Sequence, residues 1–327
     1  MSPAGPGGKG GRKPPKRGGP SGPKPKPAGG KGQGKGQGRG RPSTGASRGG
    51  ARVGKPTAAT RGQRGSGSGS ATNRRSNVGG DQVEGRQAVR ELLLAGRRKV
   101  REIWILAEQD PADILDDIAE LADAERVPVR SIGRSKFFQE ARCEAPQGVL
   151  AKAAGLPEAT FEDLVRTRGG VPPFLVAVDG VTDPGNLGAL YRSAECAGAT
   201  GMILPRHRAV HVTPTVTKAA AGAVEHLATG IVGGLPTALT ELRRAGVWTV
   251  GLDGDGALDL WQMPAADGPI CLVLGAEGAG LSRLVRERCD EIVRIPLGGA
   301  LASLNVAAAG AIACFEVARV RAAANPV

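Results

Sequence analysis

Apolar residues recur along this chain with two different spacings, and the two alternate from about residue 85 to the C-terminus. Apolar positions three or four residues apart predict helices, whereas short apolar or alternating runs predict strands. In the first part of this region the pattern predicts helices at 85–94, 111–124 and 134–140 and strands at 102–106, 127–131 and 148–153. These elements together predict a small α/β unit.

A second alternating region follows a stretch rich in glycine and proline. Its predicted strands are 174–178, 201–204, 227–231, 247–252, 270–274 and 291–295. Its predicted helices are 186–197, 213–222, 237–245, 281–288 and 303–322, and one more, 159–166, lies in the stretch before it. Alternating strands and helices predict a parallel sheet with helices on both faces. In such folds the loops at the carboxyl ends of the strands carry the chemistry.

The N-terminal segment has no such pattern. Residues 1–80 contain 18 of the 44 Lys and Arg residues and no Asp or Glu, so the remainder carries 26 basic and 31 acidic side chains, a net of −5. The same segment holds 25 of the 52 glycines and no Phe, Trp or Tyr. It cannot bury enough apolar surface to offset its ordering entropy. We expect a disordered basic segment that neutralises nucleic-acid phosphates, or alternatively a solubilising tail.

The expected organisation is therefore a basic arm, a small α/β domain, a linker and a larger α/β domain. Their boundaries are 1–76, 78–154, 155–172 and 173–327. No run reaches the ~18–20 apolar residues of a membrane-spanning helix, and the N-terminus has no apolar core of a secretion signal. Five dispersed cysteines without a Cys-x-x-Cys pair indicate a reduced, cytoplasmic protein. His207 and His211 lie four residues apart without a carboxylate or thiol at ligand spacing, so we expect no metal site.

Polar and glycine-rich loops follow three of the predicted strands, at 179–192, 274–282 and 295–306. Each has an ordinary structural explanation: Asn186 suits a helix N-cap, Ser303 suits another, and Arg192 suits a solvated helix face. Glu277 lies among three glycines, where the fold requires no carboxylate. Asn305 stands in the predicted first turn of a helix, where it contributes little to helix stability. Any one loop is a weak signal.

In this order, however, the loops resemble the SpoU (TrmH) family of the SPOUT superfamily. The resemblance rests on Asp183-Pro184-x-Asn186-x-Gly188 with Arg192, Gly275-x-Glu277-Gly278-x-Gly280-Leu281, and Ile295-Pro296-x-x-Gly299 followed by Ser303-Leu304-Asn305-Val306. The segment 218–226 also fits, and the resemblance extends over 78–321. Members are S-adenosylmethionine-dependent methyltransferases that modify a ribose 2′-hydroxyl of RNA. The resemblance therefore implies an enzyme that works without a metal.

The resemblance also implies a C-terminal trefoil knot, a homodimer and roles for individual residues. The methyl donor would contact the backbone at Gly275, Ile295 and Leu304. Arg192 would bind phosphate and assist loss of the 2′-hydroxyl proton, and stabilisation of the alkoxide is its physically simpler role, because arginine stays protonated. Asn186 would orient Arg192 or the ribose, and Glu277 would orient partner groups. Ser303 and Asn305 would hold the donor pocket and the incoming ribose. Tyr191, beside Arg192, suits core packing better than base stacking.

Residues 78–153 resemble the small RNA-binding domain of the 23S rRNA guanosine 2′-O-methyltransferases. The marks are Gly85-Arg86-Gln87-Ala88-Val89 at its start and Gln147-Gly148-Val149 at its end. This domain favours a guanosine of 23S rRNA as the target. The same chemistry on tRNA or on an rRNA adenosine is an alternative, and so is a non-catalytic RNA-binding or ribosome-assembly protein. A nucleotide-dependent dehydrogenase is disfavoured, because no Gly-x-Gly-x-x-Gly follows the first strand of either domain.

Overall fold

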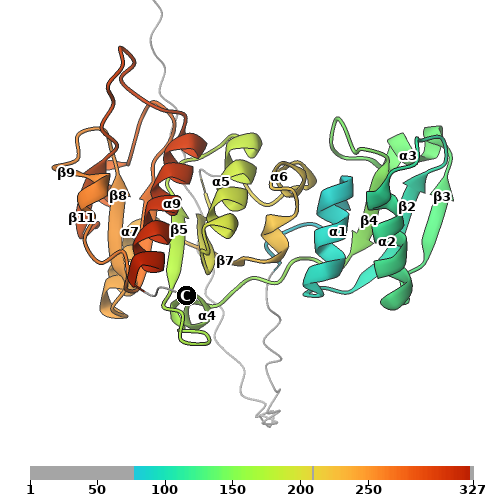
Figure 1. Ribbon diagram of the computed structural model, residues 1–327, viewed down its shortest axis with the longest axis horizontal. Coiled ribbons are helices and arrows are strands. Elements are labelled where there is room, and N and C mark those ends of the chain that lie inside the picture. The colour runs from blue at the N-terminus through green and yellow to red at the C-terminus, as the bar shows by residue number, and fades with distance from the viewer. Residues whose placement is uncertain (1–76, 208–209, 325–327) are drawn as a thin grey trace, which may run out of the picture. The chain divides into compact units, whose positions relative to one another are not determined.

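A computed structural model describes residues 77–207 and 210–324, which all belong to one compact unit. The basic segment predicted over 1–76 lies outside the described residues. Within them the chain forms two sheets, one in the first predicted α/β region and one in the second (Figure 1).

The smaller sheet has the strand order β1-β4-β2-β3 within the described residues. Its elements are β1 (Gln82–Glu84), α1 (Arg86–Ala95), β2 (Val100–Leu106), α2 (Asp113–Ala124), β3 (Val129–Ile132), α3 (Arg134–Glu140) and β4 (Val149–Ala153). Strand β2 runs parallel to β3, while β4 is antiparallel to both β1 and β2.

Strand β1 was not predicted, because two of its three residues are polar. Both are nevertheless buried. The Glu84 carboxylate accepts hydrogen bonds from Gln82 Nε2 at 2.7 Å and from the backbone N–H groups of Arg142 and Cys143 at 2.6 and 3.0 Å. Satisfied hydrogen bonds make such burial tolerable. This compensation cannot be read from local pattern.

The larger sheet has the order β7-β6-β5-β10-β8-β11-β9 in the described part of the chain, and every strand pair in it is parallel. Helix α4 (Phe161–Val165) precedes it. Its elements are β5 (Phe174–Val178), α5 (Pro184–Cys196), β6 (Gly201–Pro205), α6 (Pro214–Ala219), η1 (Ala223–Glu225), β7 (Ala228–Val232), α7 (Leu235–Arg244), β8 (Trp248–Leu252), β9 (Leu258–Asp259), η2 (Leu260–Gln262), β10 (Ile270–Leu274), α8 (Arg283–Arg286), β11 (Glu291–Arg294) and α9 (Val306–Ala324). The predicted parallel α/β sheet is confirmed. The trefoil knot stays a prediction.

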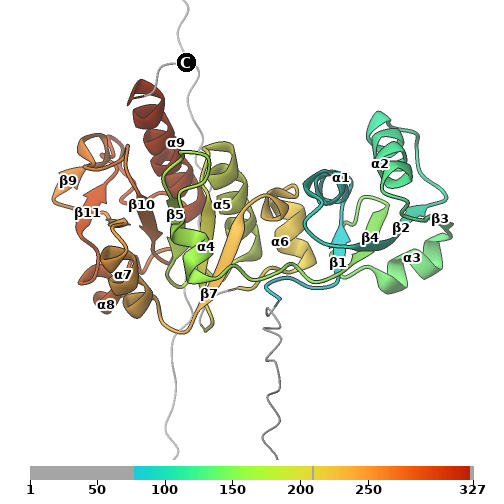
Figure 2. The ribbon, with the colours of Figure 1, turned by 90° about the horizontal axis from the view of Figure 1, so that it is seen from below.

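Helices cover both faces of this sheet, with α5 and α9 on one side and α4 and α7 on the other (Figures 1 and 2). Neighbouring residues of a strand point to opposite faces. Val176 of β5 accordingly belongs to the same core cluster as Leu190 and Val317, while Leu175 belongs to the cluster that contains Leu239. Tyr191 is fully buried, and its hydroxyl lies 3.0 Å from Thr229 Oγ1, as core packing predicts.

Several helices begin at other residues than the sequence predicted, and two of these, α5 and α9, concern candidate site residues. The N-cap of α5 is Asp183, whose Oδ1 accepts the Asn186 N–H at 2.7 Å, so the prediction that Asn186 caps this helix is wrong. The long C-terminal helix begins at Val306, not at Ser303. Asn305 Oδ1 accepts the N–H groups of Ala307 and Ala308 at 2.9 and 3.3 Å, which is the capping geometry expected of Ser303. Because Asp183 caps α5, the Asn186 side chain is available for other contacts. The capping bonds of Asn305 hold its side chain in place.

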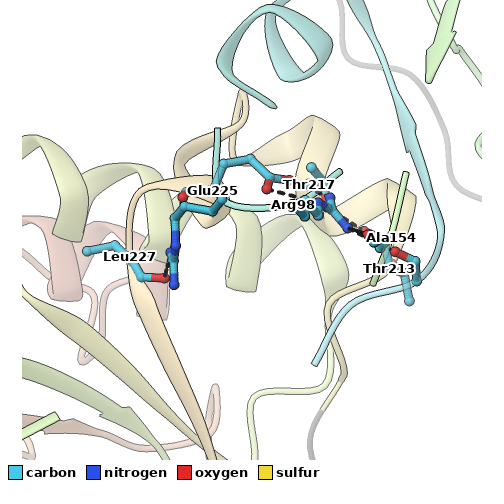
Figure 3. Close-up of polar contacts among 8 residues, drawn as sticks. Arg98, Ala154, Thr213, Thr217, Glu225 and Leu227 are labelled. Atoms are coloured by element: carbon cyan, nitrogen blue, oxygen red, sulfur yellow. Dashed lines mark hydrogen bonds and ion pairs between the residues drawn. The ribbon is translucent and has the colours of Figure 1, made fainter. Parts of the chain in front are cut away.

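A buried ion pair joins the two α/β regions, between the α1–β2 turn and η1 (Figure 3). Arg98, between α1 and β2, donates from Nε and Nη2 to both carboxylate oxygens of Glu225 at 3.0 and 2.5 Å, and from Nη1 to the carbonyl of Ala154. Arg97 donates to the carbonyls of Glu225 and Leu227. Burial raises the pKa of Glu225, and the Arg98 charge opposes that rise. The close hydrogen bonds of the pair therefore have to offset the free-energy cost of burying both charges.

Candidate active site

The loops that follow β5 and β10 are tied together at the carboxyl edge of the larger sheet. The backbone N–H of Asp179 donates to the Leu274 carbonyl at 2.7 Å, and the Asp179 carboxylate accepts the Ser282 N–H at 2.7 Å. The first and second polar loops of the sequence therefore meet where a parallel sheet places its ligands.

A cavity of about 530 Å³ opens at this edge. It is lined by 252–255 after β8, by 274–281 after β10, and by Arg286, Ile295, Leu297, Ala302, Ser303, Leu304, Val306 and Ala309. Gly275, Ile295 and Leu304, the residues expected to hold the methyl donor, all lie in this wall. The structure thus brings them to one cavity. Their contacts with the donor remain a prediction.

Gly275 shapes the wall because no side chain fits there. A Cβ at this position would lie 2.2 Å from the carbonyl carbon of Gly280. The turn closes just beyond it, where Ala276 and Gly280 exchange backbone hydrogen bonds of 3.0 and 2.9 Å. Glu277 sits at the tip of this turn and lines the cavity. The glycine spacing of the motif therefore serves a tight backbone crossing.

Three predicted site residues form one hydrogen-bonded network. Asn305 Nδ2 donates to Asn186 Oδ1 at 2.9 Å and to Glu277 Oε1 at 3.4 Å, and Asn186 Nδ2 donates to Glu277 Oε2 at 3.2 Å. All three side chains are accessible to solvent. Asn186 lies in the first turn of α5, Asn305 directly precedes α9 and Glu277 lies in the glycine turn, so the network joins the beginnings of both helices to that turn. The remaining N–H group of Asn186 and the Glu277 carboxylate can orient a polar ligand at the cavity mouth.

Two other predicted residues lie outside this network. Ser303 is exposed and lines the cavity, but forms no hydrogen bond with the described residues. Arg192 is exposed on α5, and its guanidinium forms no hydrogen bond or ion pair within 77–207 and 210–324. The expected alternative that Asn186 orients Arg192 is not found, because the Asn186 side chain is bonded to Glu277 and Asn305.

Sequence reasoning missed an ion pair in the cavity wall. Arg286 Nη1 lies 2.8 Å from Asp253 Oδ1. Burial opposes ionisation of Asp253, but hydrogen bonds from Arg286 and the Asp255 N–H outweigh it and lower the pKa. Asp253 directly follows the buried strand β8. A polar residue at that edge was a usable signal, although no motif contains it.

The remaining chemistry of the described residues adds no metal centre. They contain no cluster of His, Cys, Asp and Glu suited to a metal ion. All five cysteines are free thiols. Between residues 77 and 324, where the structure describes the chain, no helix combines the length and apolar character needed to cross a bilayer.

Comparison with known proteins agrees with this site. Residues 173–315 match the SpoU rRNA methylase family, and residues 82–159 match the RNA 2′-O ribose methyltransferase substrate-binding domain. The fold and site thus define an RNA 2′-O-methyltransferase. The chain belongs to the SpoU rRNA methylase family.

Two curated relatives illustrate the similarity. The putative TrmH family tRNA/rRNA methyltransferase YacO of Bacillus subtilis is 36% identical over 76% of this chain and 97% of its own length. The 23S rRNA (guanosine-2′-O-)-methyltransferase RlmB of Pseudomonas aeruginosa is 38% identical over 74% of this chain and 97% of its own length.

Solved structures show the same fold. The SpoU methyltransferase AviRb from Streptomyces viridochromogenes, in complex with AdoMet, has a TM-score of 0.62 and 28% identity, covering 73% of this chain and 89% of that chain. An AdoMet-bound rRNA methyltransferase from Sinorhizobium meliloti has a TM-score of 0.58 and 25% identity, covering 73% of this chain and 87% of that chain.

Proposed function

We propose that this protein transfers a methyl group from S-adenosylmethionine to the 2′-hydroxyl of a guanosine in 23S rRNA. The observation that carries the proposal is the similarity over nearly the full length of relatives named for that reaction. The same two-part arrangement, a substrate-binding match followed by a methylase match, supports RNA as the partner.

The cavity at Gly275 suits this methyl donor. Its wall carries three acidic residues, Asp253, Asp255 and Glu277, against one basic residue, Arg286, a formal balance of −2. The donor carries a sulfonium and an ammonium against one carboxylate, so it is a cation that such a wall attracts. Backbone groups at Gly275, Ile295 and Leu304 would hold it. When bound, it supplies an electrophilic methyl group.

The protein's own residues would position the ribose and stabilise its oxygen. The network of Asn186, Glu277 and Asn305 orients the incoming nucleotide at the cavity mouth, with Ser303 beside it. Arg192 has a guanidinium free of described partners, so it is available to a phosphate and to the developing 2′-alkoxide. Its high basicity makes electrostatic stabilisation the better description than proton abstraction.

The wider assembly follows from the same proposal. Helix α9 is rich in apolar residues, and Phe315 on it remains 51% exposed. A second copy of the chain would cover that surface, which gives a homodimer. Residues 1–76 would supply sequence-independent attraction to RNA, 78–154 would select a feature of the RNA, and 173–327 would carry the reaction in the cytoplasm.

The direct test combines purified protein and labelled S-adenosylmethionine with unmodified 23S rRNA and tRNA. We expect label in 23S rRNA, recovered after alkaline hydrolysis as an uncleaved dinucleotide. Arg192→Ala should lower the rate by about 100-fold or more, the usual loss when one oxyanion donor is removed. Arg244→Ala, which removes an equal charge from the exposed surface of α7, should not.

Other outcomes have clear meanings. Label in tRNA would keep the chemistry and overturn the target, a possibility that the name of the Bacillus subtilis relative includes. Absence of label together with absence of donor binding in calorimetry would overturn the enzyme and leave an RNA-binding protein.

A further inference from the structure

The smaller sheet carries a cavity of its own, separate from the one at Gly275. Its volume is about 580 Å³. It is lined by Arg86 and Gln87 at the start of α1, by Leu106, Gln109 and Ile114 around the end of β2 and the start of α2, and by Gln147 and Gly148 before β4. The residues by which the sequence resembles a family domain, around 86 and 147, thus form one wall.

Arg86 holds this cavity together. Its Nε donates to the Gln147 carbonyl and its Nη2 to Gln109 Oε1, each at 3.1 Å. Its backbone N–H donates to Gln147 Oε1, also at 3.1 Å. Gly148 allows this approach, because a Cβ there would lie 2.1 Å from Gln109 Oε1. The guanidinium is therefore fixed in direction before any ligand arrives.

After the hydrogen bonds between Arg86, Gln109 and Gln147 are counted, most polar groups still available to a ligand are N–H donors. Arginine has five N–H groups on its guanidinium, and only two of those on Arg86 have partners among the described residues. The side-chain oxygens of Gln109 and Gln147 are both occupied by Arg86. The Nε2 group of Gln147 has no partner in the part of the chain that the structure describes. The polar edge of the cavity thus favours a ligand that presents acceptors.

Two of the remaining lining residues, Leu106 and Ile114, are apolar, and Gln87 is polar. Leu106 is 7% exposed and Ile114 is partly exposed, so Ile114 offers most of the hydrocarbon surface to a flat ring. Lys218 of α6 approaches Gly85, the residue before Arg86, because its Cγ would lie 3.2 Å from a Cβ placed on Gly85. A planar group with acceptors on one edge and a nearby negative charge fits this arrangement.

We propose that this cavity binds one unpaired guanine base of the RNA, from a nucleotide other than the one methylated. The free N–H groups of Arg86 would donate to guanine O6 and N7, the commonest specific contact of arginine with a base. Lys218 would meet the adjoining phosphate. Proteins read RNA sequence chiefly through such extruded, single-stranded bases. The inference rests on the proposed function only in taking RNA as the substrate.

The test measures binding of the full-length protein to RNA hairpins without methyl donor. The hairpins share one stem and a cytidine loop, and differ only in a central guanosine or 7-deazaguanosine, which lacks the N7 acceptor. We expect the wild-type protein to prefer guanosine by about fivefold or more. Attraction by the basic residues 1–76 acts on both hairpins equally and cancels in this ratio.

Variants of α1 locate the preference. Arg86→Gln should abolish it, and Arg86→Lys should do so as well, because lysine keeps the charge but lacks the two-pronged guanidinium. Arg90→Gln removes the same charge from the same helix outside the cavity and should retain the preference. Arg86→Lys also serves if Arg86→Gln fails to fold.

Three results would overturn the inference. The first is equal binding of both hairpins by the wild type, and the second is loss of the preference in Arg90→Gln. The third is equal weakening of both hairpins by Arg86→Gln with a salt dependence reduced by about one charge, which would mark a phosphate contact. None of these depends on methyl transfer, so failure here and failure of the proposed reaction are separable.

Discussion

The side-chain amide of Asn305 donates to the side-chain oxygen of Asn186 over 2.9 Å, although the two residues lie 119 positions apart. The direction of this bond is fixed, because Asn305 Oδ1 already accepts two backbone N–H groups of α9. One side chain therefore caps a helix with its oxygen and organises the candidate site with its nitrogen.

Asn305 variants should separate these two roles. Asn305→Ala removes both, and we expect the free energy of unfolding to fall by about 0.5–2 kcal/mol, the usual cost of losing a cap. Asn305→Asp keeps the capping oxygen but replaces the donor with a carboxylate facing Glu277. We expect it to unfold in urea near the wild-type midpoint while methyl transfer falls strongly. Equal activity of Asn305→Asp and the wild type would contradict the network's role.

Gly275→Ala should damage donor binding. The added methyl group would collide with the backbone of Gly280, so the turn that carries Glu277 must open. Overpacking of this kind costs about 1–3 kcal/mol, which corresponds to about 5- to 150-fold weaker binding of S-adenosylmethionine in calorimetry. Gly233→Ala is the control, since nothing lies within 4 Å of its added Cβ. Unchanged affinity in Gly275→Ala would place the donor elsewhere.

The ion pair between the sheets should be costly to break and cheap to replace. Arg98→Met leaves the buried Glu225 carboxylate without its partner, and we expect a loss of about 3–5 kcal/mol in urea unfolding. The double variant Arg98→Met, Glu225→Leu should recover much of that loss, because it buries no charge. A double variant as unstable as the single one would show that the carbonyl contacts of Arg98 matter more than the pair.

Asp290, in the turn between α8 and β11, should make stability depend on acidity. Burial opposes its ionisation, but hydrogen bonds from the Thr249 N–H and hydroxyl at 2.9 and 2.7 Å and an ion pair with Arg243 outweigh burial and lower its pKa. The unfolded chain therefore binds this proton first as pH falls. The contribution of Asp290 is complete above the ordinary aspartate pKa of about 3.9 and is lost as pH drops through the lower folded value.

Unfolding curves between neutral pH and pH 3 would check this dependence. Asp290→Asn should lower stability at neutral pH by about 1–3 kcal/mol and flatten the acid limb of the curve. Asp110→Asn, which changes an exposed carboxylate, should leave that limb unchanged. An acid limb as steep in Asp290→Asn as in the wild type would assign the effect to other groups.

The sequence predicted the bounds of the two buried strands β5 and β10 to the residue. It did not predict the short polar strand β1 or the contacts between loops. Phe174–Val178 and Ile270–Leu274 are buried on both faces, so their apolar runs mark their full extent. Two of the three residues of β1 are polar, and hydrogen bonds to the loop at 142–143 stabilise their burial. The motifs identified Asn186, Glu277 and Asn305 as candidate site residues. Their hydrogen bonds to one another, and the ion pair of Asp253 with Arg286, depend on loop geometry that arises only when the sheet is formed.

The Arg98–Glu225 pair has a consequence for how a target nucleotide is chosen. A desolvated, doubly hydrogen-bonded charge pair is costly to separate, so it favours one contact between the α1–β2 turn and η1. An RNA held by the smaller sheet would then offer to the cavity at Gly275 only the nucleotide that lies one fixed reach away. The target nucleotide would be selected by its distance from the bound part of the RNA, and few contacts to the target base itself would be needed.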